Sequence, residues 1–185
     1  MKINCSRPAT LRLTLAALLL VSFNNLMLSA QQPSSTEAQR EAMQKLSFLA
    51  GHWSGPITIV RGSPGEPRHL TQTEEIQYKL DGFVMLIEGA SRDTGGQAQF
   101  SALATIAFDD PTHTYRIRAY HDGHYLDTEL TVRPNSFSWG FDSGPAHIAN
   151  AMHLTAKGEW AEVTVVTVGS NPPFHSVNML LQHQP

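Results

Sequence analysis

About ten strand-like runs follow one another from His52 to the C-terminus, with turn sequences between them about every ten to fifteen residues. The clearest run spans Gln99 to Phe108, where apolar and polar residues alternate with the period of a half-buried strand. Its inward positions are Phe100, Ala102, Ala104, Ile106 and Phe108. Because Ala102 and Ala104 are small, we expect room on that face.

The turns between these runs indicate how the strands connect. Asp-Gly pairs at 81–82 and 122–123 predict two-residue hairpins. With mainly hairpin connections and no crossover helices, the runs favour an all-β, antiparallel up-and-down barrel of about ten strands. At this strand number the lumen of a closed barrel is wide enough to hold a ligand. An open sandwich is the alternative fold, because alternation alone does not show closure.

A short helix is expected before the first strand. Ser34 and Glu37 have the spacing of a capping box, in which each side chain satisfies a free amide at the helix start. Met43, Leu46 and Leu49 then fall three residues apart. Such a narrow apolar stripe is typical of a helix that lies against a larger structure.

The first thirty residues have the pattern of a secretory signal peptide. Lys2, Arg7 and Arg12 form a positively charged segment, residues 13–23 are apolar, and residues 28–30 resemble a cleavage site. The apolar run is shorter than the roughly twenty residues that a membrane-spanning helix needs. We therefore expect export to the periplasm or the cell exterior, with no stable membrane insertion after cleavage.

This interpretation divides the chain into a signal peptide (1–30), a flexible lead (31–36) and a barrel domain (37–185). The only cysteine, Cys5, lies in the signal peptide, so disulfides and thiol chemistry are not expected in the mature protein. Cleavage leaves 10 Lys and Arg against 16 Asp and Glu, a formal charge of −6. Nucleic acid is therefore an unexpected partner, because its binding needs a basic surface.

Gly51-His52-Trp53, at the junction of the expected helix and the first strand, resembles the Gly-x-Trp signature of the calycin superfamily, which includes the lipocalins. The surrounding Leu46, Phe48, Leu49 and Gly55 make the stretch more similar to nitrobindin-like barrels and their secreted lipocalin-like relatives. Nitrobindin-like proteins have a further glycine where this chain has Ile57. The resemblance implies a ten-stranded barrel with an apolar cavity, whose end is closed by the motif tryptophan.

For nitrobindin itself, the resemblance also implies a heme held by a histidine on the last strand. The corresponding residue here is His175, within residues 172–177. His175 alternates with Val177 and Met179, so the period of a strand places them on one face. If that face is the lumen, a neutral imidazole there could bind heme iron among apolar neighbours.

The main functional hypothesis is a barrel that binds a small apolar or amphipathic molecule in its lumen, with heme as its sharper form. Four residues are candidates for the pocket wall: Trp53, Phe100, Ile106 and Trp139. For Trp53, packing at the barrel end is the favoured interpretation, because buried indoles pack while seeking one partner for the ring N–H. For the aromatic candidates, packing in the core is the favoured interpretation, and a place in the cavity wall is the alternative.

Two other classes remain open. An enzyme with a site at the barrel mouth would use His121, His124 or Arg118; the two histidines flank a hairpin turn, but two ligands do not make a metal site. Glu74 and Glu75 are adjacent and point to opposite faces of a strand, so they cannot act together as acid and base. Because no catalytic motif is present, an enzyme is the less expected class. The third class is a solidly packed interaction module.

Overall fold

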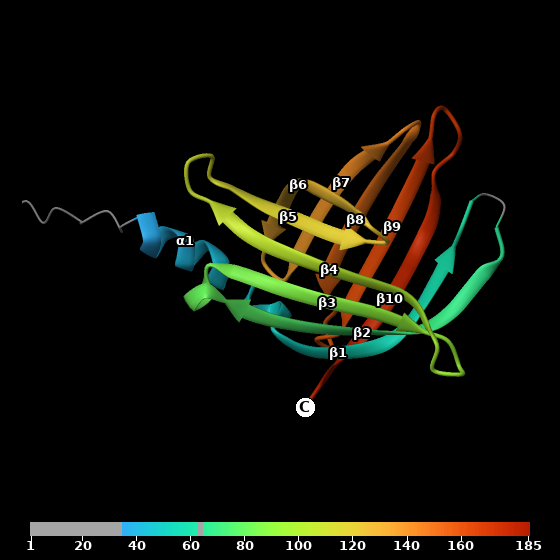
Figure 1. The fold of residues 1–185 in the computed structure, drawn as a ribbon, viewed down its shortest axis with the longest axis horizontal. Coiled ribbons are helices and arrows are strands. Elements are labelled where there is room, and N and C mark those ends of the chain that lie inside the picture. Colours follow the sequence, from blue (N-terminus) through green and yellow to red (C-terminus); the bar gives the residue numbers. More distant parts are fainter. Residues whose placement is uncertain (1–34, 63–64) are drawn as a thin grey trace, which may run out of the picture. The chain divides into compact units, whose positions relative to one another are not determined.

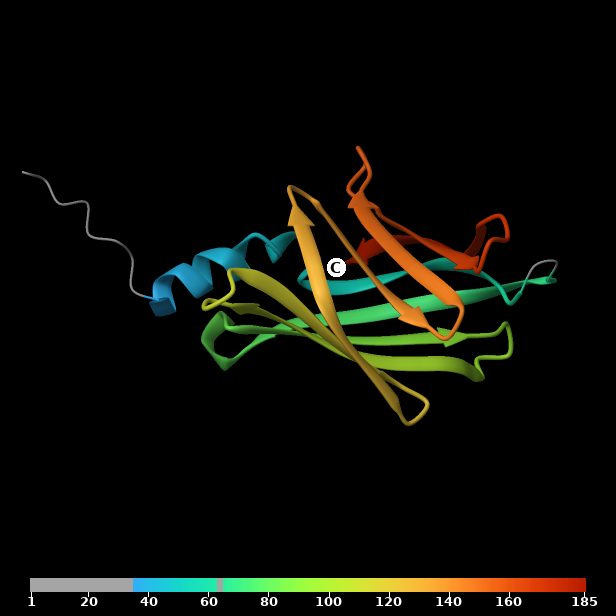
Figure 2. The same ribbon diagram turned by 90° about the horizontal axis from the view of Figure 1, so that it is seen from above.

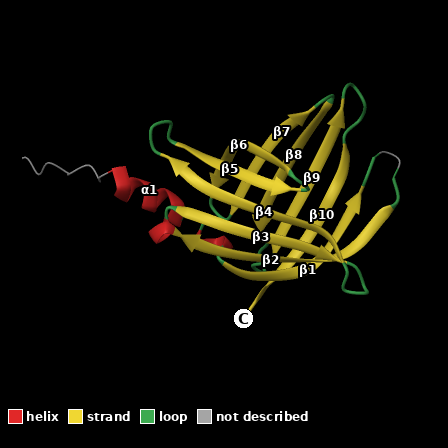
Figure 3. Cartoon of the chain, in the orientation of Figure 1, coloured by secondary structure: helices red, strands yellow, loops and turns green. Residues whose placement is uncertain are grey.

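The computed structural model describes residues 35–62 and 65–185, in which ten antiparallel strands form a closed barrel (Figures 1 and 3). The strands are β1 (Gly51–Val60), β2 (Pro67–Lys79), β3 (Val84–Arg92), β4 (Ala98–Asp109), β5 (Thr114–His121), β6 (His124–Arg133), β7 (Ser136–Ser143), β8 (Ala146–Leu154), β9 (Trp160–Val168) and β10 (Phe174–Gln184). The expected signal peptide, the lead up to Ser34 and the capping box at Ser34 lie outside the described residues.

Each strand pairs with the next one in sequence, and β1 pairs with β10 to close the barrel. The closing register joins His52 to Gln184 and Ile59 to Val177, so β1 and β10 pair along most of their length (Figure 2). This closure confirms the barrel and excludes the open sandwich. Within the described residues, no helix is long and apolar enough to cross a membrane.

The two Asp-Gly turns have different outcomes. His121 pairs with His124, and Asp122 and Gly123 between them have positive φ angles of 48° and 75°, as a two-residue hairpin requires. At Asp81-Gly82 the predicted two-residue loop was wrong, because the loop spans four residues, 80–83. There Lys79 pairs with Val84, and the chain turns through a short 3₁₀ segment at Leu80–Gly82.

The N-terminal helix α1 (Ser35–Gln44) lies at one end of the barrel and is followed by a 3₁₀ turn, η1 (Ser47–Leu49). The last carbonyls of an α-helix lack partners within the helix and must find them elsewhere. Here the Tyr115 hydroxyl donates to the Ala42 carbonyl at 2.7 Å, and the Tyr78 hydroxyl donates to the Met43 carbonyl at 2.8 Å. Two strands therefore hold the end of α1 against the barrel.

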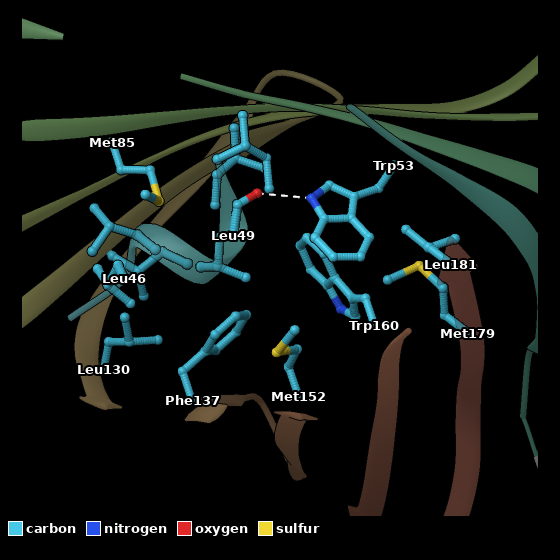
Figure 4. Packing of buried hydrophobic residues seen from close by; sticks show 14 of the residues in the cluster. Leu46, Leu49, Trp53, Met85, Leu130, Phe137, Met152, Trp160, Met179 and Leu181 are labelled. Carbon is cyan, nitrogen blue, oxygen red and sulfur yellow. Dashed lines mark hydrogen bonds between the residues drawn. The ribbon is translucent and has the colours of Figure 1, made fainter. Parts of the chain in front are cut away.

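A packed core fills the barrel at the end covered by α1 and η1 (Figure 4). Met43, Leu46 and Leu49 are fully buried, but only Met43 lies on α1, which ends at Gln44; Leu46 follows it and Leu49 belongs to η1. The predicted apolar stripe thus continues past the end of the helix. Trp53 lies beside these residues, and its ring N–H donates to the Leu49 carbonyl at 2.8 Å. The Trp53 ring also meets Trp160 edge-on, with centroids 5.8 Å apart. Trp53 thus joins η1 to the first strand and closes this end of the barrel.

The two glycines around Trp53 have steric roles. Gly51 has a φ of 122°, and an added Cβ would lie 2.4 Å from the His183 ring. At Gly55 an added Cβ would lie 2.2 Å from the Leu180 carbonyl oxygen, because the β1 and β10 backbones approach closely there. The glycines of the Gly-x-Trp-x-Gly sequence are therefore required by the close approach of β1 to β10, where the barrel closes.

Candidate functional site

The other part of the lumen holds a cavity of about 440 Å³. Its apolar wall comes from most strands of the barrel: Ile57, Ile59, Ile87, Phe100, Ala102, Ala104, Ile117, Ala119, Leu126, Phe137, Trp139, Phe141, Trp160, Val177 and Met179. The cavity extends from Trp160, beside the packed core, to Arg61, which is exposed at the far end of β1. This part of the lumen is therefore hollow.

The inward face of β4 shows why the cavity lies where it does. Ala102 and Ala104 line it, as expected from their small size, whereas Ile106 further along the same face is fully buried in the packed core. On the neighbouring strand β3, Gly89 pairs with Ala102 and also lines the cavity. Short side chains on adjacent strands leave the space that larger residues fill near α1.

A polar group on β2 and β3 interrupts the apolar wall. Gln72 is buried and donates from Nε2 to the Glu74 carboxyl at 2.7 Å, while the Ser91 hydroxyl donates to the side-chain Oε1 of Gln72. Gly89 provides the space for the Glu74 carboxyl, since a Cβ at Gly89 would lie 2.6 Å and 2.7 Å from its oxygens. The position of Glu74 thus depends on a chain of hydrogen bonds and on one missing side chain.

A second polar group lines the cavity from β8 and β9. Glu162 accepts a hydrogen bond from the Trp160 ring N–H at 2.9 Å. Two residues further along β9, the Thr164 hydroxyl donates to the side-chain Oδ1 of Asn150 at 2.5 Å. The Nδ2 atom of Asn150 is buried and has no hydrogen-bond partner among the described residues. Buried amide groups are rarely left unpaired, so this donor indicates a position where a ligand or water belongs.

Both carboxyls are perturbed by their surroundings. Burial raises the pKa of Glu74 to about 7, against a lowering by its hydrogen bond from Gln72, and repulsion from Glu162 raises it further. Burial also raises the pKa of Glu162 to about 7, although its hydrogen bond from Trp160 lowers it. Both side chains keep some accessible surface because they face the cavity. Near neutral pH this site therefore holds two acids that are easily charged or neutralised.

The four pocket candidates divide between the two parts of the lumen. Phe100 and Trp139 line the cavity, and Trp139 stacks on Phe141 with ring centroids 5.8 Å apart. Trp53 and Ile106 do not line it; both are buried in the packed core. All four residues face inward, but at different positions along the barrel axis. Those near α1 are covered by the helix and η1, whereas those further along line the cavity.

His175 is exposed and does not line the cavity. A register shift in the pairing of β10 with β9 lies between His175 and Val177, so the two residues do not share a face as strict alternation predicts. Ser176 and Val177 line the cavity in its place. The expectation of one shared face was therefore wrong at His175 and correct for Val177 and Met179, which both line the cavity.

Of the residues considered for a barrel-mouth site, His121 and His124 are cross-strand partners that line one hollow at the β5–β6 hairpin, whereas Arg118 does not line it. Arg118 is exposed and shares the Asp127 carboxylate with Arg116, and hydrogen bonds from Arg116 and then Arg118 hold the pKa of Asp127 below its usual value. His121 lines the cavity at its far end, where Nδ1 donates to the Ser101 carbonyl at 2.9 Å. His124 is exposed across the hairpin. Among the described residues, no cluster of three or more His, Cys, Asp or Glu side chains could hold a metal ion.

Sequence reasoning missed the polar groups in the lumen. Glu74 was considered only with its neighbour Glu75, and that pair does point apart, since Glu74 faces the cavity and Glu75 does not line it. The relevant partner, Glu162, lies seven strands later in the chain. It comes close enough to repel the Glu74 carboxylate because β1 and β10 close the barrel. A sequence signal did exist, since Glu162 is the one charged residue of β9.

Fold and site together define a class: a closed, ten-stranded antiparallel barrel with a hollow lumen and buried acidic groups. Among solved structures, the chain is similar to the crystal structure of Rv2717c from M. tuberculosis, with a TM-score of 0.60 and 12% sequence identity. The likeness covers 78% of this chain and 98% of that one. At this identity it shows a shared fold. No protein-family profile matches the sequence, and no curated protein matches it either.

Proposed function

We propose that this protein is an exported, calycin-like barrel, related to the nitrobindin-like group, that binds a small amphipathic molecule in its lumen. The observation that carries the proposal is the cavity of about 440 Å³ with an apolar wall and a few convergent polar groups. Ligand sites in proteins are typically concave spaces of about 300–1,000 Å³ with this composition. The Gly51-x-Trp53-x-Gly55 motif and the ten-strand count support the calycin part of the proposal.

The walls and the polar groups have separate roles in such binding. Burial of a ligand's alkyl chain contributes about 0.8 kcal/mol per methylene group. The polar groups contribute orientation, because leaving a buried donor or acceptor unpaired costs about 1–3 kcal/mol. A ligand with an apolar tail and one polar end therefore fits this lumen better than a wholly polar or wholly apolar molecule.

Heme is a special case of this proposal. The resemblance implies an axial histidine on the last strand, but His175 is exposed and lies outside the cavity. We therefore propose a lumen ligand that does not use His175. A visible titration of the mature chain with hemin tests this, with His175→Ala as the comparison. A sharpened Soret band that disappears in the variant would contradict the proposal and assign the iron to His175.

The general test uses the fluorescence of Trp139 and Trp160, which both line the cavity. Titration of the mature chain with 1-octanol should change the emission saturably. Replacing 1-octanol by 1-hexanol removes two methylene groups, about 1.6 kcal/mol, so it should weaken binding about fifteenfold. A change that does not saturate, or that is independent of chain length, would contradict lumen binding.

A pair of variants locates the site. Ala102→Leu places a branched side chain into the cavity and should weaken 1-octanol binding, while the fold is retained because there is space for the new atoms. Ala151→Leu makes the same change at an exposed position of β8 and should bind as the wild type does. Equal loss in both variants would show that the alcohol binds elsewhere or that the barrel is disturbed.

A further inference from the structure

We propose that the ligand of the lumen is an amphipathic amine, whose cationic head lies between the carboxyls of Glu74 and Glu162. This inference rests on the proposed function and deepens it by naming the chemistry of the ligand's polar end. The alternatives are a neutral polar head, such as an alcohol, and an acidic head, such as a carboxylic acid.

The charges along the cavity wall are arranged by sign. The charged or titratable side chains that line it are Arg61, Glu74, His121 and Glu162. Arg61 follows the last residue of β1, and His121 ends β5, so both lie at the end of the barrel away from α1. Glu162 lies near the start of β9, beside Trp160, and Glu74 pairs across strands with Trp53. The deep part of the cavity therefore has acidic groups and no basic group among the described residues.

Neither acid has a counter-charge in the described part of the chain. Glu74 accepts a hydrogen bond from the neutral amide of Gln72, and Glu162 accepts one from the neutral indole of Trp160. A carboxylate has about four acceptor positions, so both groups keep capacity that these contacts do not use. The five ion pairs found among the described residues involve neither of them. Buried carboxylates are ordinarily paired, which leaves the place of the cation to a ligand.

Two further residues of the cavity wall, Gly89 and Asn150, favour a bound polar group near the acids. Gly89 leaves space around the Glu74 carboxyl that any other side chain would take. Asn150 is only 6% accessible, and its Nδ2 atom lacks a partner. Exchanging the positions of the side-chain oxygen and nitrogen would leave the oxygen unpaired instead. In either orientation, one polar atom of Asn150 therefore lacks a hydrogen-bond partner. In the exchanged orientation the free oxygen would accept a hydrogen bond from the ligand's ammonium group.

The aromatic residues add to the preference for a cation. Phe137, Trp139, Phe141 and Trp160 line the same cavity as the two acids. The faces of aromatic rings carry negative partial charge and attract ammonium groups. The wall is therefore favourable for a cation even where it is apolar, whereas an anionic head would meet two acids and the ring faces.

Binding of a cation should be coupled to proton release. Burial holds the pKa of both acids near 7, so at that pH each is partly protonated. A bound ammonium favours the charged carboxylates and lowers both pKa values, which releases protons to the solvent. A neutral head would release none, and an acidic head would take protons up.

The experiment compares three probes of equal chain length, octylamine, 1-octanol and octanoate, by calorimetry with the folded mature chain at pH 8 and pH 5.5. Octylamine should bind at least about tenfold more tightly than 1-octanol at pH 8, as charge-assisted hydrogen bonds would give. This preference should shrink at pH 5.5, where both acids are neutral. At pH 7, calorimetry in buffers of different ionisation enthalpy should show proton release with octylamine alone.

Variants assign the effect to the two acids. The double variant Glu74→Gln/Glu162→Gln should lose the preference for octylamine over 1-octanol and should lose the proton release. Gly89→Ala moves the Glu74 carboxyl without removing it, and should weaken octylamine more than 1-octanol. Glu88→Gln is the control, because it removes an exposed carboxyl on the same strand as Gly89.

The outcomes separate this inference from the proposed function. Equal binding of octylamine and 1-octanol, unchanged in the double variant, would overturn the amine inference and leave lumen binding in place. Tighter binding of octanoate at pH 5.5 would overturn it in favour of an acid that shares a proton with Glu74 or Glu162. If the folded protein binds none of the three probes, the proposed function and the inference both fail.

Discussion

The stability of the barrel should fall as the pH rises through neutrality, and Glu162→Gln should remove much of that fall. The pKa of Glu162 is 4.5 in the unfolded chain and about 7 in the barrel, so between these values the folded state binds more protons than the unfolded state. Stability then decreases with rising pH. A difference of about 2.5 pKa units corresponds to about 3 kcal/mol, at 1.36 kcal/mol for each unit.

This contribution is fully present below pH 4.5 and is lost as the pH rises through about 7. Between pH 5 and pH 8 the wild type should therefore lose roughly 2–3 kcal/mol at this one group. Glu162→Gln does not titrate, yet its side-chain oxygen still accepts the hydrogen bond from the Trp160 indole. The variant should gain stability relative to the wild type by that amount over the same range.

Urea unfolding followed by tryptophan fluorescence measures the effect at several pH values from 5 to 8. The informative quantity is the difference in unfolding free energy between Glu162→Gln and wild type, since titrations of groups that do not interact with Glu162 cancel from it. The repulsion between Glu162 and Glu74 belongs to the measured effect, because the variant removes it as well. Glu88→Gln, which removes an exposed carboxyl, should follow the wild-type curve. Parallel curves for wild type and Glu162→Gln would refute the reasoning, because they would show that Glu162 titrates alike in the folded and unfolded states.

Three further variants test the sealed end of the barrel by urea unfolding. Leu49→Ala should cost about 2–5 kcal/mol, because Leu49 is fully buried; a cost below 1 kcal/mol would contradict its place in the core. Trp53→Phe should cost about 1–3 kcal/mol of stability, since the buried Leu49 carbonyl loses its hydrogen-bond donor. An unchanged urea midpoint of unfolding would refute the Trp53–Leu49 hydrogen bond. Gly55→Ala should destabilise by at least about 1–3 kcal/mol, because its Cβ meets the Leu180 carbonyl oxygen, and a neutral result would exclude this close approach.

The alternating pattern of the strands was enough to predict the fold. A half-buried strand alternates, and several runs, most clearly β4, showed this period of two. The number of runs and their short connections indicated a meander. The turn at Asp81-Gly82 was misplaced because tertiary contacts act on it. Arg40 of α1 donates to the Asp81 carbonyl at 3.2 Å and lies over the Phe83 ring, which holds a longer turn against the helix.

The site was less predictable because it depends on contacts distant in sequence and on one local irregularity. Alternation assigns residues to faces, but it does not say how far along the lumen each one lies, so Ile106 and Phe100 looked equivalent. It also fails where a strand is irregular, as between His175 and Val177. The meeting of Glu74 with Glu162 requires the closure of β1 on β10 and its register, which no single segment encodes.

Burying the carboxyls of Glu74 and Glu162 beside the lumen lowers the stability of the protein near neutral pH, and the fold does not require these acids. Near neutral pH, the wild type pays for the burial of Glu74 and Glu162, whereas a glutamine at either position would keep the hydrogen bonds without the charge. Groups that destabilise a protein in this way are concentrated at functional sites. A variant Glu162→Gln that is both more stable at pH 8 and weaker in binding octylamine would show that this cost serves ligand recognition. A variant that is more stable and binds octylamine as the wild type does would separate the two, and would leave the buried acids without a role in binding.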